Sequence, residues 1–115
     1  MYSEIQHYSI FIDSGTSENQ SITSIHLFDG EGKIIGVLEF LDPGYAVPDR
    51  KNHEVIHLKY SVNKFPYVLD VLRNEKPVYI GYWENQFGKY GRIYTGMEGV
   101  GEGEIDLSIN QKQSS

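Results

Sequence analysis

Cysteine is absent from this sequence of 115 residues. Without thiols the chain can form no disulfide scaffold, no thiolate zinc finger and no iron–sulfur site, and it has no cysteine nucleophile. Long apolar runs are also missing, because stretches such as Ile10–Ile12 are far too short to span a bilayer. Residues Met1–Ile12 lack the basic stretch and the apolar run of a signal peptide. We therefore expect a cytoplasmic protein with no membrane partner.

Basic residues are scarce, since ten lysines and arginines stand against sixteen acidic residues and leave a formal net charge of −6. The excess lies in the first half, because residues 1–57 contain nine acidic and three basic residues. An acidic surface repels phosphate groups. The charge therefore argues against nucleic acid as a partner.

Aromatic residues and glycine are plentiful, with nine tyrosines, five phenylalanines, one tryptophan and twelve glycines. This combination favours β structure with tight turns. Apolar residues alternate with polar ones in several short stretches, and Asp29-Gly30 is a favoured hairpin turn between two of them. Residues 42–52 contain two prolines and a glycine and predict an irregular segment. We expect strands at residues 8–12, 22–29, 34–41, 56–60, 78–84, 92–97 and 104–109.

Residues 64–75 change period and predict a helix. Their apolar residues recur at helical spacing, with Pro66 tolerated in the first turn. Ser61 or Asn63 is expected to cap the start, and Asn74 with Pro77 to end it. The face expected to anchor the core consists of Phe65, Val68, Leu69 and Leu72.

The predicted fold class is α+β. We expect a curled, mostly antiparallel sheet of about seven strands, a barrel-like roll, with one helix packed on it. The length accommodates one domain, assigned to residues 1–110, and residues 111–115 form a flexible polar tail.

His53–His57 matches the His-Glu-x-x-His pattern of zinc proteases. That pattern requires a helix, on which two histidines one turn apart share a metal. Here the residues that follow alternate as a strand, on which the two histidines would lie about 13 Å apart. We therefore predict that His53 and His57 bind no zinc.

Other candidate motifs also lack the context that chemistry needs. Gly96–Glu104 is rich in glycine but has no Lys-Ser/Thr ending, no following helix and no EF-hand spacing. His7 and His26 lie on predicted strands, where a structural role is the ordinary one, and no nucleophile elbow accompanies any serine. No catalytic residue, metal ligand or cofactor is predicted.

Aromatic residues crowd the predicted hairpin at residues 78–97. Alternate residues of a strand point to opposite faces, so these rings cannot all enter one core. They could serve as ordinary core and sheet aromatics, as a protein interface, or as a pocket in which carboxylates help to hold an organic cation. The candidate ligand or interface residues are Tyr79, Tyr82, Trp83, Phe87, Tyr90, Tyr94, Glu84 and Glu98.

The stretch Phe65–Ile80, together with Gly99–Glu104, resembles small bacterial proteins of unknown function that include products of mobile integron gene cassettes. The early hairpin with Asp29-Gly30 and Gly36–Leu38 is similar too. The resemblance covers the central and C-terminal two-thirds of the chain. It implies a compact α+β fold with an unassigned role, and it supplies no functional residues.

These observations favour a non-enzymatic binding or interaction module that forms a homodimer, with Trp83 or nearby tyrosines at the interface. The partner could also be another protein or a small molecule. The alternative is a small-molecule-binding protein or small enzyme whose pocket is lined by tyrosine, histidine and glutamate and takes an organic cation or an apolar ligand.

Overall fold

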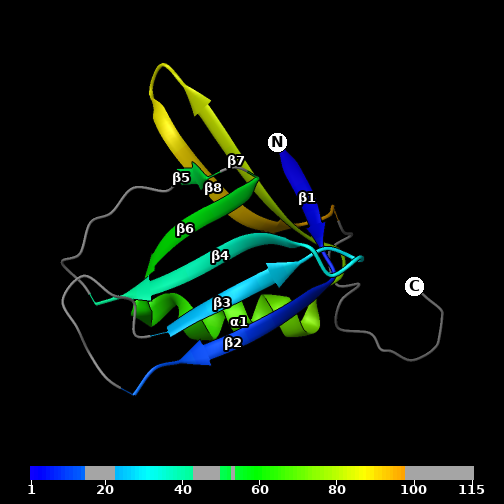
Figure 1. Cartoon of the computed structure of the whole chain (residues 1–115), viewed down its shortest axis with the longest axis vertical. Helices are drawn as coiled ribbons and strands as arrows, with labels where there is room; N and C mark the ends of the chain where they lie inside the picture. Colours follow the sequence, from blue (N-terminus) through cyan, green and yellow to red (C-terminus); the bar gives the residue numbers. More distant parts are fainter. Residues whose placement is uncertain (15–22, 43–49, 53, 98–115) are drawn as a thin grey trace.

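The computed structural model describes residues 1–14, 23–42, 50–52 and 54–97. Within them the chain forms eight strands, one 3₁₀ helix and one α-helix (Figure 1). The expected α+β class with mostly antiparallel pairing is confirmed. The expected single roll of about seven strands is wrong, because the described strands divide into two sheets that do not close into a barrel.

The larger sheet has the order β2-β3-β4-β6-β5. The predicted hairpin is confirmed as the antiparallel pair β3–β4, and the Asp29 carboxylate in its turn accepts hydrogen bonds from the backbone N–H groups of Glu31 and Lys33. Two features were not expected: β4 and β6 are parallel, and β5 lies inside the segment predicted to be irregular. The strands are β2 (His7–Ile12), β3 (Thr23–Phe28), β4 (Ile34–Leu41), β5 (Arg50–Asn52) and β6 (Val55–Ser61).

The smaller sheet consists of β1 (Tyr2–Ile5), β7 (Val78–Asn85) and β8 (Gly88–Thr95), in the antiparallel order β1-β7-β8. The sequence did not predict β1, because four residues are too few to show a period. The chain passes from β1 into β2 at Gln6, whose N–H donates to the carbonyl of Phe28. The β7–β8 hairpin extends beyond the larger sheet (Figure 1).

The predicted helix is confirmed as α1 (Phe65–Asn74), which follows the 3₁₀ helix η1 (Val62–Lys64) and has proline in its first turn. It lies against one face of the larger sheet (Figure 1). The expected capping is wrong. The N-cap residues are Ser61 for η1 and Lys64 for α1, and neither side chain makes a capping hydrogen bond.

Most of the predicted helix face reaches the core. Val68 is buried, and Phe65 and Leu72 pack against the buried cluster, whereas Leu69 is only half-buried and is not part of it. The helix therefore anchors itself through Val68 rather than through Leu69.

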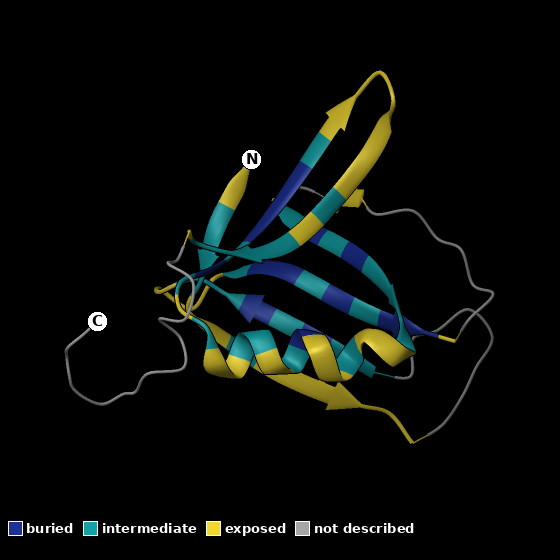
Figure 2. Ribbon diagram, turned by 180° about the vertical axis from the view of Figure 1, so that it is seen from behind, coloured by how far each residue is buried: buried dark blue, intermediate teal, exposed yellow. Residues whose placement is uncertain are grey.

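The core lies between the inner face of the larger sheet on one side and α1 with the smaller sheet on the other (Figure 2). Two glycines allow the sheets to approach. A Cβ on Gly36 would overlap the Ile80 side chain of β7, and a Cβ on Gly91 would overlap the Leu58 side chain of β6. The members of the buried cluster are Ile25, Leu27, Ile35, Leu38, Phe40, Ile56, Leu58, Val68, Ile80 and Tyr82.

Several predicted features lie outside the described residues. These are the strand at 104–109, the tail at 111–115, most of the glycine-rich segment, His53 and Glu98. In the described part of the chain, no helix has the length and apolar character needed to cross a membrane.

Candidate functional site

The pairing register of the smaller sheet gathers the aromatic residues on one face. Tyr79 stands opposite Tyr94, and Trp83 stands opposite Tyr90. Residues paired across strands share a face, as do residues two apart along a strand. The pairing of β1 with β7 adds Tyr2, beside Gly81, to the same face. We call this set the aromatic ladder: Tyr2, Tyr79, Trp83, Tyr90 and Tyr94.

The aromatic ladder faces away from the core. The alternate residues of β7, Val78, Ile80 and Tyr82, are buried on the opposite face. Tyr2 remains 65% exposed and Tyr90 41% exposed, while the other three ladder residues are half-buried. Because large apolar residues usually leave the surface when a core is available, this exposed face calls for a functional explanation.

The rings of the ladder contact one another continuously across the three strands. Tyr79 and Tyr94 stack with centroids 5.4 Å apart, and Trp83 and Tyr90 stack at 5.6 Å. Trp83 also lies 6.2 Å from Tyr94, and Tyr2 meets Tyr79 edge-on at 6.0 Å. Each such pair contributes about 0.5–1.5 kcal/mol beyond its buried area. These ring contacts therefore restrict the side-chain conformations of the ladder within the single chain.

Arg92 places a cation against the ladder. Its Cζ lies 5.3 Å from the ring centroid of Trp83 and 5.8 Å from that of Tyr90, within the range of a cation–π interaction. The guanidinium thereby covers ring faces that an external organic cation would need. With Arg92 in this position, the ladder is better suited to contact a flat surface than to enclose an organic cation.

Charge and ionisation also characterise this sheet. Partial burial, followed by the nearby Tyr2 and Tyr79, raises the pKa of Tyr94 above its ordinary value, so its hydroxyl is neutral at physiological pH.

The charged residues of the three strands comprise two of each sign: Glu4, Glu84, Lys89 and Arg92. The smaller sheet is thus neutral in a chain whose net charge is −6.

The structure separates the candidate residues predicted from the sequence. Tyr79, Trp83, Tyr90 and Tyr94 come together in the ladder, whereas Tyr82 is 6% exposed on the core side. Phe87 is 88% exposed in the β7–β8 turn, where its N–H donates to Asn85 Oδ1. Glu84 lies 3.8 Å from Lys89 in an exposed ion pair, and Glu98 lies outside the described residues.

Sequence reasoning missed two members of this surface. Arg92 sits midway between Tyr90 and Tyr94, so the two-residue period of a strand could have placed it on their face. No sequence signal connected Tyr2 to this hairpin, because its position depends on the pairing of β1 with β7, which lies far later in the chain and sets Tyr2 beside Gly81. Only the fold brings Tyr2 to Tyr79.

A second polar cluster occupies the outer face of the larger sheet. Glu39 and Lys59 form an ion pair in which the lysine side chain is only 12% exposed, and burial lowers the pKa of Lys59. His57 lies on β6, as the strand prediction required. Burial, then the charges of Arg50 and His26, lower the pKa of His57. Among the residues described, no group of three or more histidine, aspartate or glutamate side chains could hold a metal ion.

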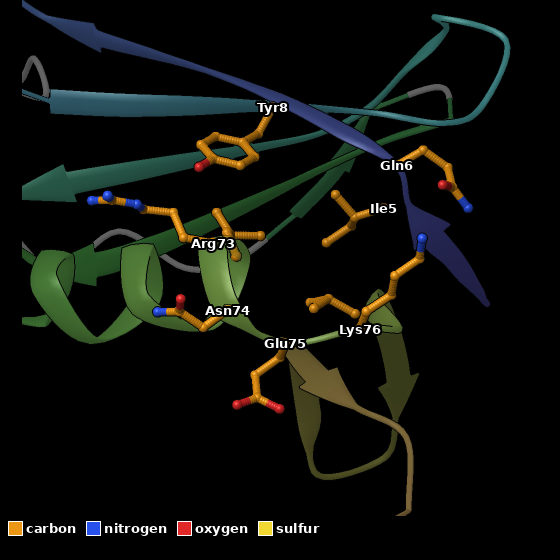
Figure 3. A pocket seen from close by; sticks show the side chains of 9 residues that line it. Ile5, Gln6, Tyr8, Arg73, Asn74, Glu75 and Lys76 are labelled. Carbon is orange, nitrogen blue, oxygen red and sulfur yellow. The ribbon is translucent and has the colours of Figure 1, made fainter. Parts of the chain in front are cut away.

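A pocket of about 280 Å³ lies elsewhere, at the C-terminal end of α1 (Figure 3). It is lined by residues of α1, of the bend between β1 and β2, and of the segment leading into β7. Within the described residues, no histidine and no member of the ladder takes part in its lining. The described lining thus lacks the convergence of histidine and carboxylate that would indicate acid–base catalysis.

Comparison with known proteins finds no matching protein family, no matching curated protein and no matching solved structure. A fold alone does not specify an activity. The function has to be argued from the surfaces described above.

Proposed function

We propose that this protein is a non-enzymatic binding module, that the aromatic ladder is its interaction surface, and that a second copy of the chain occupies it. The observation that carries the proposal is the face on which the rings stand. Five aromatic side chains from three strands line the side of the smaller sheet opposite the core, and Tyr2 and Tyr90 remain exposed there.

The chemistry of the ladder suits a protein partner. Tyrosine, tryptophan and arginine are enriched at the energetically dominant positions of protein interfaces. The ring contacts already hold Trp83 and Tyr90 in place, so less side-chain freedom is lost on binding. An ordered aromatic surface therefore supports association better than separate exposed rings would.

The charge distribution supports a second copy as the occupant. A twofold interface brings the same patch of both subunits together. In a chain of net charge −6 most such contacts would bring acidic groups together, but the smaller sheet carries two charges of each sign. Self-association through this sheet therefore involves little electrostatic repulsion.

Light scattering at low micromolar concentration tests the proposal directly. We expect the mass of a dimer for the natural chain, and a shift towards monomer in Tyr2→Ser/Tyr90→Ser. Tyr67→Ser is the matched control, because Tyr67 is 71% exposed on α1 and contributes nothing to the ladder. A monomer at every concentration, or equal effects of the two variants, would reject the dimer.

Binding of an organic cation to the ladder is a second candidate, because the ring faces of Trp83 and Tyr90 that Arg92 now covers would accept another cation if the guanidinium moved aside. If the chain is monomeric, titration with tetramethylammonium should quench or shift Trp83 fluorescence saturably. Arg92→Ala should then strengthen the response, because it removes the internal competitor. A response that is absent in both proteins excludes this candidate.

A further inference from the structure

β2 forms one border of the larger sheet. The strand order β2-β3-β4-β6-β5 leaves it paired with β3 alone among the described strands. It runs along the edge of the molecule, with no described segment beyond it (Figure 1). Alternate residues of such a strand direct their backbone N–H and C=O groups outward, where they can pair with another strand.

β2 lacks the features that usually protect a sheet edge, which are short length, charged residues, proline and bulges. It is six residues long, pairs with β3 without a register shift, and contains no acidic residue, lysine, arginine or proline. The opposite border, β5, is three residues long and carries Arg50 and Lys51. In the smaller sheet, the edge strand β1 carries Glu4, and the edge strand β8 carries Lys89 and Arg92. Among the described edge strands, β2 is therefore the least protected against pairing.

Three consecutive large apolar side chains of β2 are exposed: Ile10 at 39%, Phe11 at 46% and Ile12 at 72%. Ile10 and Ile12 share a face with Tyr8, which packs against the buried cluster. Phe11 lies on the other face, where its ring centroid is 4.4 Å from that of His26. A strand added to β2 would therefore cover apolar side chains on both faces of the sheet.

We propose that β2 pairs with β2 of a second copy, antiparallel about a twofold axis, and joins two larger sheets into one. Opposite residues of an antiparallel pair share a face, so the axis can pass beside Ile10 and set it opposite Ile10 of the partner subunit. Tyr8 then stands opposite Ile12 of the partner subunit, and Ser9 opposite Phe11 of the partner subunit. This register brings Tyr8, Ile10 and Ile12 together on the core side of the joined sheet.

The ends of the same register match in polarity. His7 stands opposite Asp13 of the partner subunit, and both residues are exposed in the single chain. An imidazole N–H can donate to a carboxylate, and a twofold axis makes the pair twice. Asp13 directly follows β2, so this contact brings it to a donor and not to another carboxylate. In a chain of net charge −6, this match favours a second copy as the occupant.

This contact is separate from the one proposed for the aromatic ladder, because β2 belongs to the larger sheet. One short strand from each subunit forms a smaller joint than the roughly 800 Å² per partner of a stable interface, so we expect weak association. Sedimentation equilibrium from low micromolar to millimolar concentration tests it. In Tyr2→Ser/Tyr90→Ser, which disrupts the ladder, the mass should rise from monomer to dimer over this range.

The natural chain distinguishes a failure of this proposal from a failure of the ladder proposal. With both contacts, its mass should exceed that of a dimer at millimolar concentration. If the ladder does not associate, the natural chain is a monomer at low micromolar concentration and still becomes a dimer through β2. A mass that stays constant up to millimolar concentration in both proteins overturns the pairing of β2.

Variants in the Tyr2→Ser/Tyr90→Ser background test the strand and its register. Ile10→Lys sets two ammonium groups opposite each other and should weaken association at least tenfold. Phe87→Lys is the matched control, because Phe87 is exposed in the β7–β8 turn, far from β2 (Figure 1). An equal effect of these two variants would refute the pairing.

His7→Asp should also weaken association, because it opposes two carboxylates. Addition of Asp13→His to that variant exchanges the two residues and should restore the pairing. Both positions are exposed, so the exchange leaves the core untouched. If the exchanged chain associates no better than His7→Asp alone, the register centred on Ile10 is wrong and the proposal fails.

Discussion

The indole of Trp83 lies over Gly81, two residues earlier on the same face of β7. A Cβ added to Gly81 would overlap Cη2 of that ring and stand 3.0 Å from two further ring atoms. The glycine thus provides the flat backbone on which the largest side chain of the ladder rests. Because Trp83 contacts Tyr90, Tyr94 and Arg92 from this position, the order of the ladder depends on a residue that has no side chain.

Gly81→Ala should displace Trp83 from the ladder. We expect a changed fluorescence emission, a weaker near-ultraviolet circular dichroism signal and a loss of about 1–3 kcal/mol of stability, corresponding to two ring contacts. Gly30→Ala is the control, because an added Cβ there meets nothing nearer than 3.6 Å. Unchanged Trp83 emission in Gly81→Ala would show that the indole does not rest on this glycine.

Gly91→Ala should destabilise the protein more than Gly36→Ala. At Gly91 the added Cβ would stand 2.9 Å from the backbone oxygen of Gly81, which cannot move aside without disturbing the β7–β8 pairing. At Gly36 the nearest obstacle is the terminal methyl of Ile80, which can rotate. We expect a cost of about 1–3 kcal/mol for Gly91→Ala in urea unfolding. Equal midpoints for the two variants would contradict this ranking.

Leu38→Ala and Leu69→Ala compare the same truncation at two depths. Leu38 is fully buried in β4, so its loss should cost about 2–5 kcal/mol. Leu69 is half-buried on α1, and its truncation should cost about 1 kcal/mol, because less apolar surface returns to water. Denaturant midpoints measure both. A larger loss for Leu69→Ala would mean that α1 packs through a different face.

The free energy of unfolding should decrease as the pH falls below about 6.5, because His57 becomes protonated more readily in the unfolded chain. Burial, Arg50 and His26 hold the folded-state pKa of His57 below its ordinary value of 6.5. Between the two pKa values the unfolded chain binds a proton that the folded chain does not, so the free energy of unfolding decreases with falling pH. The contribution is complete above pH 6.5 and is lost as the pH falls towards the folded-state pKa.

His57→Gln should reduce this pH dependence, measured as the change in urea midpoint between pH 7.5 and pH 5.5. His7→Gln, at an exposed position on β2, provides the comparison. The assignment to His57 fails if His7→Gln flattens the profile and His57→Gln leaves it as it was.

Much of the local structure could be predicted from periodicity. The strands at residues 8–12, 34–41 and 56–60 and the helix at 65–74 follow from alternation and from helical spacing. β1 and β5 could not be found in this way, because four and three residues show no period. β1 forms by pairing with the distant strand β7, and β5 pairs with β6 at the end of a segment whose prolines predict no strand. The resemblance to integron-cassette proteins stays a prediction.

The candidate surface was predicted in part. Alternation already divided the β7 residues into Tyr79, Gly81 and Trp83 on one side and Val78, Ile80 and Tyr82 on the other. It did not reveal the pocket, whose lining comes from α1, from the β1–β2 bend and from the start of β7. Residues that meet only through tertiary contacts leave no common pattern in the sequence.

The sequence by itself determined which residues share a face, because the period of a strand or helix is a local property of the backbone. Only the tertiary structure decided which face is buried. Ile80 meets Gly36 of the larger sheet, Gly91 of β8 meets Leu58, and Val78 and Tyr82 are buried on the same side, so the aromatic ladder is left outside. The choice between two apolar faces depends on the surface that each one meets, and that surface comes from strands far away in the chain.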